Sequence, residues 1–163
     1  MQRRTLLQFG LATGASLALA GCGFRLRGLD QPVVAIDVLA LEGMDSELSR
    51  KVVRRLTEAG TRIDGQAEYV LNLGPERFRE RSLSVLESGP RELEISLEVP
   101  FSVQRRADSA YLLDQQRLEV SERLTVNSDE LLAQDDLREE ARERLRDAAV
   151  SQLMNRLRAL DIS

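Results

Sequence analysis

Apolar and polar residues alternate most regularly between positions 92 and 104. Glutamate, serine and glutamine fill most of the positions between the apolar residues. Successive side chains of a β-strand point to opposite faces, so this pattern predicts a strand with one buried face and one face in water. The apolar positions are Leu93, Ile95, Leu97, Val99, Phe101 and Val103.

Two more strands are predicted beside this one. Residues 68–86 are rich in apolar residues but are interrupted at Gly74-Pro75, which indicates one long strand with a kink or bulge. Residues 118–127 resume the alternation after a turn at 107–110. Since short turns join these three segments, they are predicted to form an antiparallel meander.

An earlier apolar run covers residues 33–41 and is interrupted only by Asp37. A run without alternation is typical of a strand covered on both faces, so we expect it to be central in the sheet. A helix is predicted next, capped by Asp45 or Ser46 and ended by Gly60. Its basic face could contact a partner or a phosphate, although a solvated charged face is the commoner meaning. That face carries Arg50, Lys51, Arg54 and Arg55.

The chain is predicted to end in a long amphipathic helix over residues 135–160. Acidic residues fill its first turns and arginines its last turn, which complements the helix dipole. The regular spacing of its apolar stripe indicates packing against the core. The stripe consists of Leu137, Ala141, Leu145, Ala148, Ala149, Leu153, Leu157 and Leu160.

The predicted order is strand, helix, three strands, helix. Strands with one apolar face and helices with one apolar stripe must bury each other. The predicted class is therefore α+β, with two helices packed on one face of a four-stranded, largely antiparallel sheet.

Residues 1–21 have the pattern of a lipoprotein signal peptide. Arg3 and Arg4 precede an apolar stretch too short to span a bilayer, and Leu19-Ala20-Gly21-Cys22 has the form of a lipoprotein-processing box. We therefore expect cleavage before Cys22 and acylation of its sulfur, whether export is general or by the twin-arginine route. Residues 22–32 are then a lipidated tether and residues 33–163 a single domain. The residue after Cys22 is Gly23 and not the aspartate that commonly retains lipoproteins at the inner membrane. We therefore expect the protein to be located at the periplasmic face of the outer membrane.

Composition narrows the possible functions. Removing residues 1–21 leaves 142 residues with 21 basic and 27 acidic side chains, a formal charge of −6. Broad affinity for nucleic acid is not expected of such a chain. The chain contains no His and no Cys besides Cys22. This excludes a disulfide within the chain, a site for a soft metal ion and catalysis by an imidazole base. We expect no cofactor and no enzymatic activity, because carboxylate pairs such as Asp135-Asp136 are ordinary at a helix start.

The segment Cys22-Gly23-Phe24-Arg25-Leu26-Arg27-Gly28 resembles the mature start of LptE, the lipopolysaccharide-assembly lipoprotein family. Leu48-Ser49-Arg50, Ser84-Val85 with Gly89, and the final helix are also similar to that family. The resemblance implies a non-enzymatic protein that plugs the outer-membrane β-barrel LptD, assists its assembly and binds lipopolysaccharide. The basic residues that the family uses for that ligand would fall at Glu87 and Gln134, which do not match.

Four arginines are the candidate lipopolysaccharide contacts. Strand periodicity sends Arg77, Arg79 and Arg81 to one side, as a row about 7 Å apart at ~3.3 Å per residue, and Arg91 lies nearby in the same hairpin. The planar guanidinium group binds two phosphate oxygens at once. The alternative is that the row pairs with Glu94 and Glu98 on the neighbouring strand.

A second function stays open at this point. A free-standing lipoprotein on the periplasmic face of the outer membrane could bind lipid or peptidoglycan without a barrel partner. A lipid carrier, however, needs a larger apolar cavity than a core with 4% aromatic residues indicates.

Overall fold

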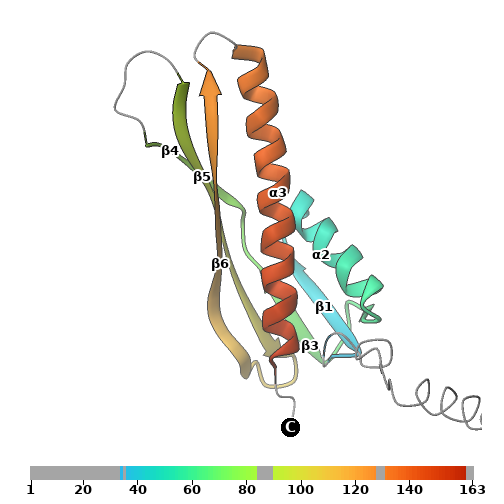
Figure 1. Cartoon of the computed structure of the whole chain (residues 1–163). Helices are drawn as coiled ribbons and strands as arrows, with labels where there is room; N and C mark the ends of the chain where they lie inside the picture. The colour runs from blue at the N-terminus through green and yellow to red at the C-terminus, as the bar shows by residue number, and fades with distance from the viewer. Residues whose placement is uncertain (1–33, 35, 84–89, 128–130, 161–163) are drawn as a thin grey trace, which may run out of the picture. The chain divides into compact units, whose positions relative to one another are not determined.

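The computed structural model of the chain describes residues 34, 36–83, 90–127 and 131–160, all within a compact unit that spans Pro32–Ser163. The predicted signal peptide, Cys22 and the tether lie outside the described residues. The elements run in the order β1 (Val38–Gly43), α2 (Glu47–Glu58), β2 (Arg62–Ile63), β3 (Tyr69–Leu73), β4 (Arg77–Ser82), β5 (Pro90–Arg105), β6 (Tyr111–Asn127) and α3 (Leu131–Arg158) (Figure 1).

The sheet that the structure describes has six strands instead of four. Its order is β2-β1-β3-β5-β4, and β6 pairs with β5. β1 runs parallel to β2 and β3, whereas β5 is antiparallel to β3, β4 and β6. The count differs because the two-residue β2 has no apolar pattern of its own and because the kinked strand divides into β3 and β4. The α+β class and the antiparallel meander are confirmed.

The kink lies where the sequence predicted it. β3 and β4 follow one another along the same edge of β5, with β3 facing residues 101–105 and β4 facing residues 93–98. Between them the Gly74 N–H donates to the Pro100 carbonyl over 2.8 Å. A side chain at position 74 would meet the Pro100 ring, so glycine allows the two segments to approach each other.

Both helices cover the same face of the sheet and lie beside each other (Figure 1). The Ser46 hydroxyl accepts from the Ser49 N–H and forms a capping box, which confirms the predicted start of α2. One continuous core joins the alternating residues of β5 to the apolar stripes of α2 and α3. β1 lies between β2 and β3 and is buried on both faces, since Leu39 belongs to this core and Ala40 to a small cluster on the other face.

α3 begins at Leu131, four residues before the predicted start, and two members of its predicted stripe are wrong. Leu137 is 37% exposed, and Ala148 is exposed as well. The inward line of the helix instead runs from Gln134 through Ala141 and Leu145. Leu137 and Ala148 each precede a residue on or close to that line. Because each residue turns the direction of the side chain by roughly 100° around the helix axis, the side chains of Leu137 and Ala148 point away from the core.

Candidate functional site

The predicted arginine row lies on the face of the sheet opposite the helices. Arg77, Arg79 and Arg81 are in register with Glu98, Ser96 and Glu94 of β5, respectively. Phe78 and Glu80, the residues between them, are in register with core residues of β5 and therefore share the helix-covered face. The three arginines are thus brought together, as strand periodicity requires.

Glutamates of β5 pair with this row. Arg81 lies 2.8 Å from Glu94, and Arg79 lies 3.4 Å from Glu98. On the other side of β5, Arg123 and Arg117 of β6 lie 3.9 and 3.2 Å from the same two carboxylates. Each glutamate side chain is therefore covered by two arginines and is only 22% or 12% exposed.

The charges on this open face almost balance. Glu92 and Glu119 lie on it as well, in register with Thr125 and Glu98. The paired arginines are 62% to 74% exposed, and exposed pairs of this kind contribute little to stability. The alternative left open by the sequence, pairing with Glu94 and Glu98, is therefore what the structure shows for Arg79 and Arg81.

Arg91 does not join the row. It is in register with Val126 on the helix-covered face, where it lines a hollow of about 420 Å³ between the ends of β4, β5, β6 and α3. The hollow is mostly polar, with Leu93 and Val126 as its apolar walls. Its polar lining consists of Glu80, Ser82, Arg91, Gln134 and Arg138.

Arg138 is a second cation in this hollow that the sequence analysis missed. Its guanidinium group lies 3.3 Å from Glu80 and 3.1 Å from Asp135, and it donates to the Gln134 amide oxygen over 3.4 Å. Gln134 is only 8% exposed and lies at the start of the helix face that, from Ala141 onward, carries apolar residues. The first part of this buried face is therefore polar. This polar extension of the apolar stripe was the signal that could have found Arg138.

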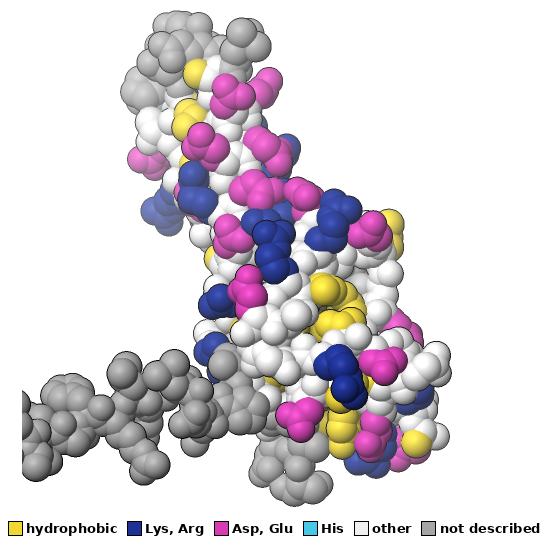
Figure 2. All heavy atoms as spheres, turned by 90° about the vertical axis from the view of Figure 1, so that its right-hand side faces the viewer, with side chains coloured by type: hydrophobic (Ala, Val, Ile, Leu, Met, Phe, Trp, Pro, Cys, Tyr) yellow, Lys and Arg dark blue, Asp and Glu magenta, His cyan; other side chains and the backbone are white. Residues whose placement is uncertain are grey.

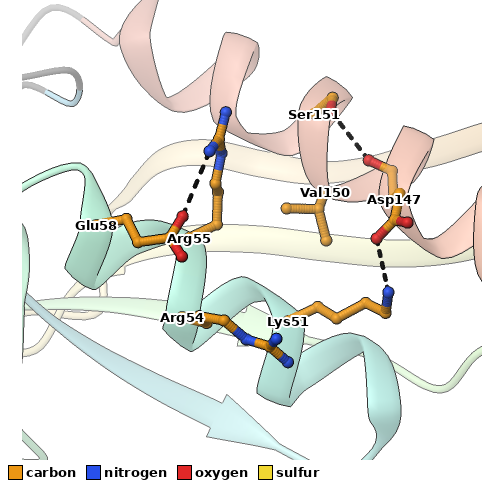
Figure 3. Close-up of a pocket in the computed structure, with 7 residues that line it drawn as sticks. All are labelled: Lys51, Arg54, Arg55, Glu58, Asp147, Val150 and Ser151. Atoms are coloured by element: carbon orange, nitrogen blue, oxygen red, sulfur yellow. Dashed lines mark hydrogen bonds and ion pairs between the residues drawn. The ribbon is translucent and has the colours of Figure 1, made fainter.

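The groove between α2 and α3 is lined by three of the four basic residues predicted on α2, Lys51, Arg54 and Arg55 (Figure 3). It measures about 240 Å³, and Val150 of α3 lies in it. The Lys51 ammonium group lies 2.7 Å from Asp147 and 2.9 Å from Glu143, and hydrogen bonds to these two carboxylates raise the pKa of Lys51. Arg55 pairs with Glu58 within α2 over 3.4 Å. Within the basic face of α2, Lys51 therefore forms ion pairs with α3 that help to hold the two helices together.

No group of three or more acidic, His or Cys side chains that could hold a metal ion occurs within the described ranges. Of the two helices that the structure describes, neither combines the length and the apolar character that a membrane crossing needs.

One of the comparisons with known proteins identifies a family. The family model described as lipopolysaccharide-assembly, LptE, matches residues 32–157. Among curated proteins no match was found.

Solved structures with a similar fold include three lipoproteins. The minor lipoprotein from Acinetobacter baumannii has 16% identity and a TM-score of 0.66, covering 77% of this chain and 93% of its own. Lipoprotein B from Nitrosomonas europaea has 20% identity and a TM-score of 0.68, with coverage of 84% and 91%. Rare lipoprotein B from Shewanella oneidensis has 23% identity and a TM-score of 0.58, with coverage of 72% and 93%. At these identities the likeness shows the fold.

Proposed function

Since the chain belongs to the LptE family of lipopolysaccharide-assembly lipoproteins, we propose that it is anchored through Cys22 in the outer membrane, where it plugs the LptD β-barrel, assists the assembly of that barrel and binds lipopolysaccharide. The observation that carries this proposal is the family match, which spans nearly all of the described chain. The role is structural and non-enzymatic.

The described surface suits a protein enclosed by a barrel. Barrel interiors are polar and wet, so a plug must expose charge instead of apolar area. Among the side chains whose exposure the structure describes, three large hydrophobic ones are exposed: Met44, Tyr111 and Leu137. Charged side chains of both signs are spread over the face that Figure 2 shows, and hydrophobic side chains reach the surface mainly in its lower half.

For the lipopolysaccharide contact, the hollow lined by Arg91 and Arg138 is the better candidate. Two guanidinium groups from different elements converge there beside a buried amide. Arg138 lies against carboxylates as Arg79 and Arg81 do, but its side chain is 23% exposed, whereas theirs are 70% and 72% exposed. Arginine binds phosphate through two oxygens at once, and such charge-assisted bonds are among the strong ones. The row of Arg77, Arg79 and Arg81 is a second, weaker contact in this proposal.

Binding of lipopolysaccharide to the purified full chain tests the assignment. The double substitution Arg91→Ala with Arg138→Ala should weaken binding about tenfold or more, because it removes two charge-assisted contacts. Substituting Arg77, Arg79 and Arg81 together by Ala should weaken it by only about threefold, because these three side chains are exposed and solvent and salt screen their charge. Circular dichroism should show that both variants stay folded. Unchanged affinity in the double variant would remove the hollow from the proposal, and unchanged affinity in the triple variant would remove the row.

Capture of the lipidated chain from detergent-extracted outer membranes separates the plug from a free-standing lipoprotein. A plug should co-purify with an LptD barrel in near-equal amounts. A lipoprotein that binds lipid or peptidoglycan on its own should emerge without a barrel, and that result would contradict the proposed function.

A further inference from the structure

β1 has a strand partner along only part of one edge. On the side away from β3, its register with β2 ends at Leu39 opposite Ile63. The last backbone bond there runs from the Asp64 N–H to the Leu39 carbonyl over 3.1 Å. Within the residues that the structure describes, no strand lies beside residues 40–43 on this edge.

The direction of the backbone groups follows from the bonds that do form. The carbonyls of Asp37 and Leu39 accept from the Arg62 and Asp64 N–H groups, so these odd-numbered residues of β1 point toward the β2 edge. In a strand both backbone groups of one residue point to the same edge, and alternate residues point to opposite edges. The N–H and C=O of Leu41 and the N–H of Gly43 therefore point to the open edge. Such a row of strand groups is a template for another strand.

An apolar groove of about 350 Å³ lies beside this open edge, between the end of β1 and the outer side of α2. Leu41, Met44, Val53 and Leu73 supply its apolar walls. Met44 is 71% exposed, more than the other exposed large hydrophobic side chains, Tyr111 at 54% and Leu137 at 37%. A strand added at this edge would direct alternate side chains into the groove, because successive side chains point to opposite faces.

The rim of the groove is acidic. Asp45 and Glu47 share the single cation Arg50 at 3.4 and 3.3 Å, and their side chains are 80% and 53% exposed. Glu42 pairs with Arg106 over 3.1 Å. Of these charged residues, Glu42, Asp45 and Arg50 line the groove itself, so one carboxylate is in excess there and basic side chains on a bound segment would be complementary to it.

We propose that the open edge of β1 and the adjoining groove bind an extended segment of another protein. The segment adds to the sheet as a strand beside Leu41 and Gly43, places an apolar side chain against Met44 and Val53, and carries basic residues at its ends. Main-chain bonds supply affinity and the groove supplies specificity, as in other cases of strand addition. The interaction is independent of the lipopolysaccharide contact.

The test uses the full chain in detergent and a labelled heptapeptide, Lys-Leu-Thr-Val-Thr-Leu-Lys, whose apolar residues all lie on one face of a strand. Fluorescence anisotropy should show saturable binding. A twin peptide with N-methyl groups on its two adjacent central residues, which blocks both strand edges but keeps every side chain, should bind about tenfold more weakly or worse. Hydrogen exchange at the Leu41 and Gly43 amides should slow when the unmodified peptide is bound.

A charge reversal gives a matched control on the protein. Asp45→Lys should weaken binding of the basic peptide several-fold, whereas Asp136→Lys, the same change at an exposed position of α3, should leave it unchanged. The proposal is overturned if the methylated twin binds as well as its parent, or if neither peptide binds at millimolar concentration. Concentration-dependent protection of the two amides without peptide would also overturn it, because a second copy of the chain would then be the occupant.

Discussion

At the residue scale, Glu76 joins three elements that are far apart in the sequence. It lies in the kink between β3 and β4. One carboxylate oxygen accepts from the Leu48 N–H in the first turn of α2 over 3.1 Å, and the other accepts from Arg146 of α3 over 2.9 Å. A carboxylate at that end of α2 also complements the helix dipole. Arg146 lies 5.2 Å from the centre of the Phe78 ring, so it is packed as well as paired.

This arrangement predicts how stability depends on pH. Burial opposes ionisation of Glu76, but the hydrogen bonds from Arg146 and the Leu48 N–H outweigh it, so its pKa lies below the ordinary value of 4.5. As the pH falls, Glu76 therefore binds a proton at a higher pH in the unfolded chain than in the folded chain. The stabilisation from its ionised carboxylate is present above pH 4.5 and is lost as the pH falls through the lowered pKa.

The substitution Glu76→Gln should therefore flatten the stability profile below pH 4.5 and lower the free energy of unfolding at neutral pH by about 1–3 kcal/mol. Urea unfolding of the full chain between pH 3 and 7 measures both effects. Glu47→Gln, which removes an exposed carboxylate, is the control and should change neutral stability by less than about 1 kcal/mol. Identical pH profiles for Glu76→Gln and the unsubstituted chain would contradict this role of Glu76.

At the element scale, the kink allows one edge of β5 to carry two strands with different surroundings. β3 is mostly buried and passes between β1 and β5, whereas β4 is mostly exposed and pairs with β5 alone. The transition depends on the close approach of Gly74 to Pro100. Because β4 also lines the hollow, the kink positions Glu80 and Ser82 there.

Gly74→Ala should destabilise the fold, because the new Cβ atom would lie 2.5 Å from the Pro100 ring and 3.0 Å from its carbonyl oxygen. We expect a loss of about 1–3 kcal/mol, the usual range for overpacking. Gly65→Ala is a matched control, since nothing lies within 4 Å of a Cβ atom at that position. Chemical denaturation of the two variants gives the comparison, and equal stability would show that the kink tolerates a side chain.

At the scale of the whole molecule, the proposed role needs the described unit to be held at a membrane. The proposal assigns this attachment to Cys22, the cysteine of the lipoprotein-processing box. Several acyl chains at about 0.8 kcal/mol per buried CH₂ group hold a protein far more firmly than one chain.

Cys22→Ser should release the exported chain from the membrane, because serine offers no thiolate for acylation. Fractionation of cells should move the variant from the outer-membrane fraction to the soluble periplasm, while an equally small change next to it, Gly23→Ser, should leave the chain in the membrane. Mass spectrometry of the unsubstituted chain should show a diacylglyceryl group on Cys22. An unmodified thiol would exclude this mode of anchoring.

Local periodicity was sufficient for most of the elements. The alternation along β5, the capped start of α2 and the break at Gly74-Pro75 are properties of neighbouring residues, so they can be seen before the chain folds. The register of the arginine row is local too, because side chains two apart on a strand always share a face.

Contacts between distant residues could not be read in this way. Glu76 lies 28 positions from Leu48 and 70 from Arg146, and nothing in either neighbourhood marks these partners. The sequence offered the pairing of the arginine row with Glu94 and Glu98 only as one of two alternatives. The short β2, the two β6 arginines that share these glutamates, and the meeting of Arg91 with Arg138 depend on the tertiary structure. Each segment carries its own preference for strand or helix, but the choice of partner is made by the packing of the whole core.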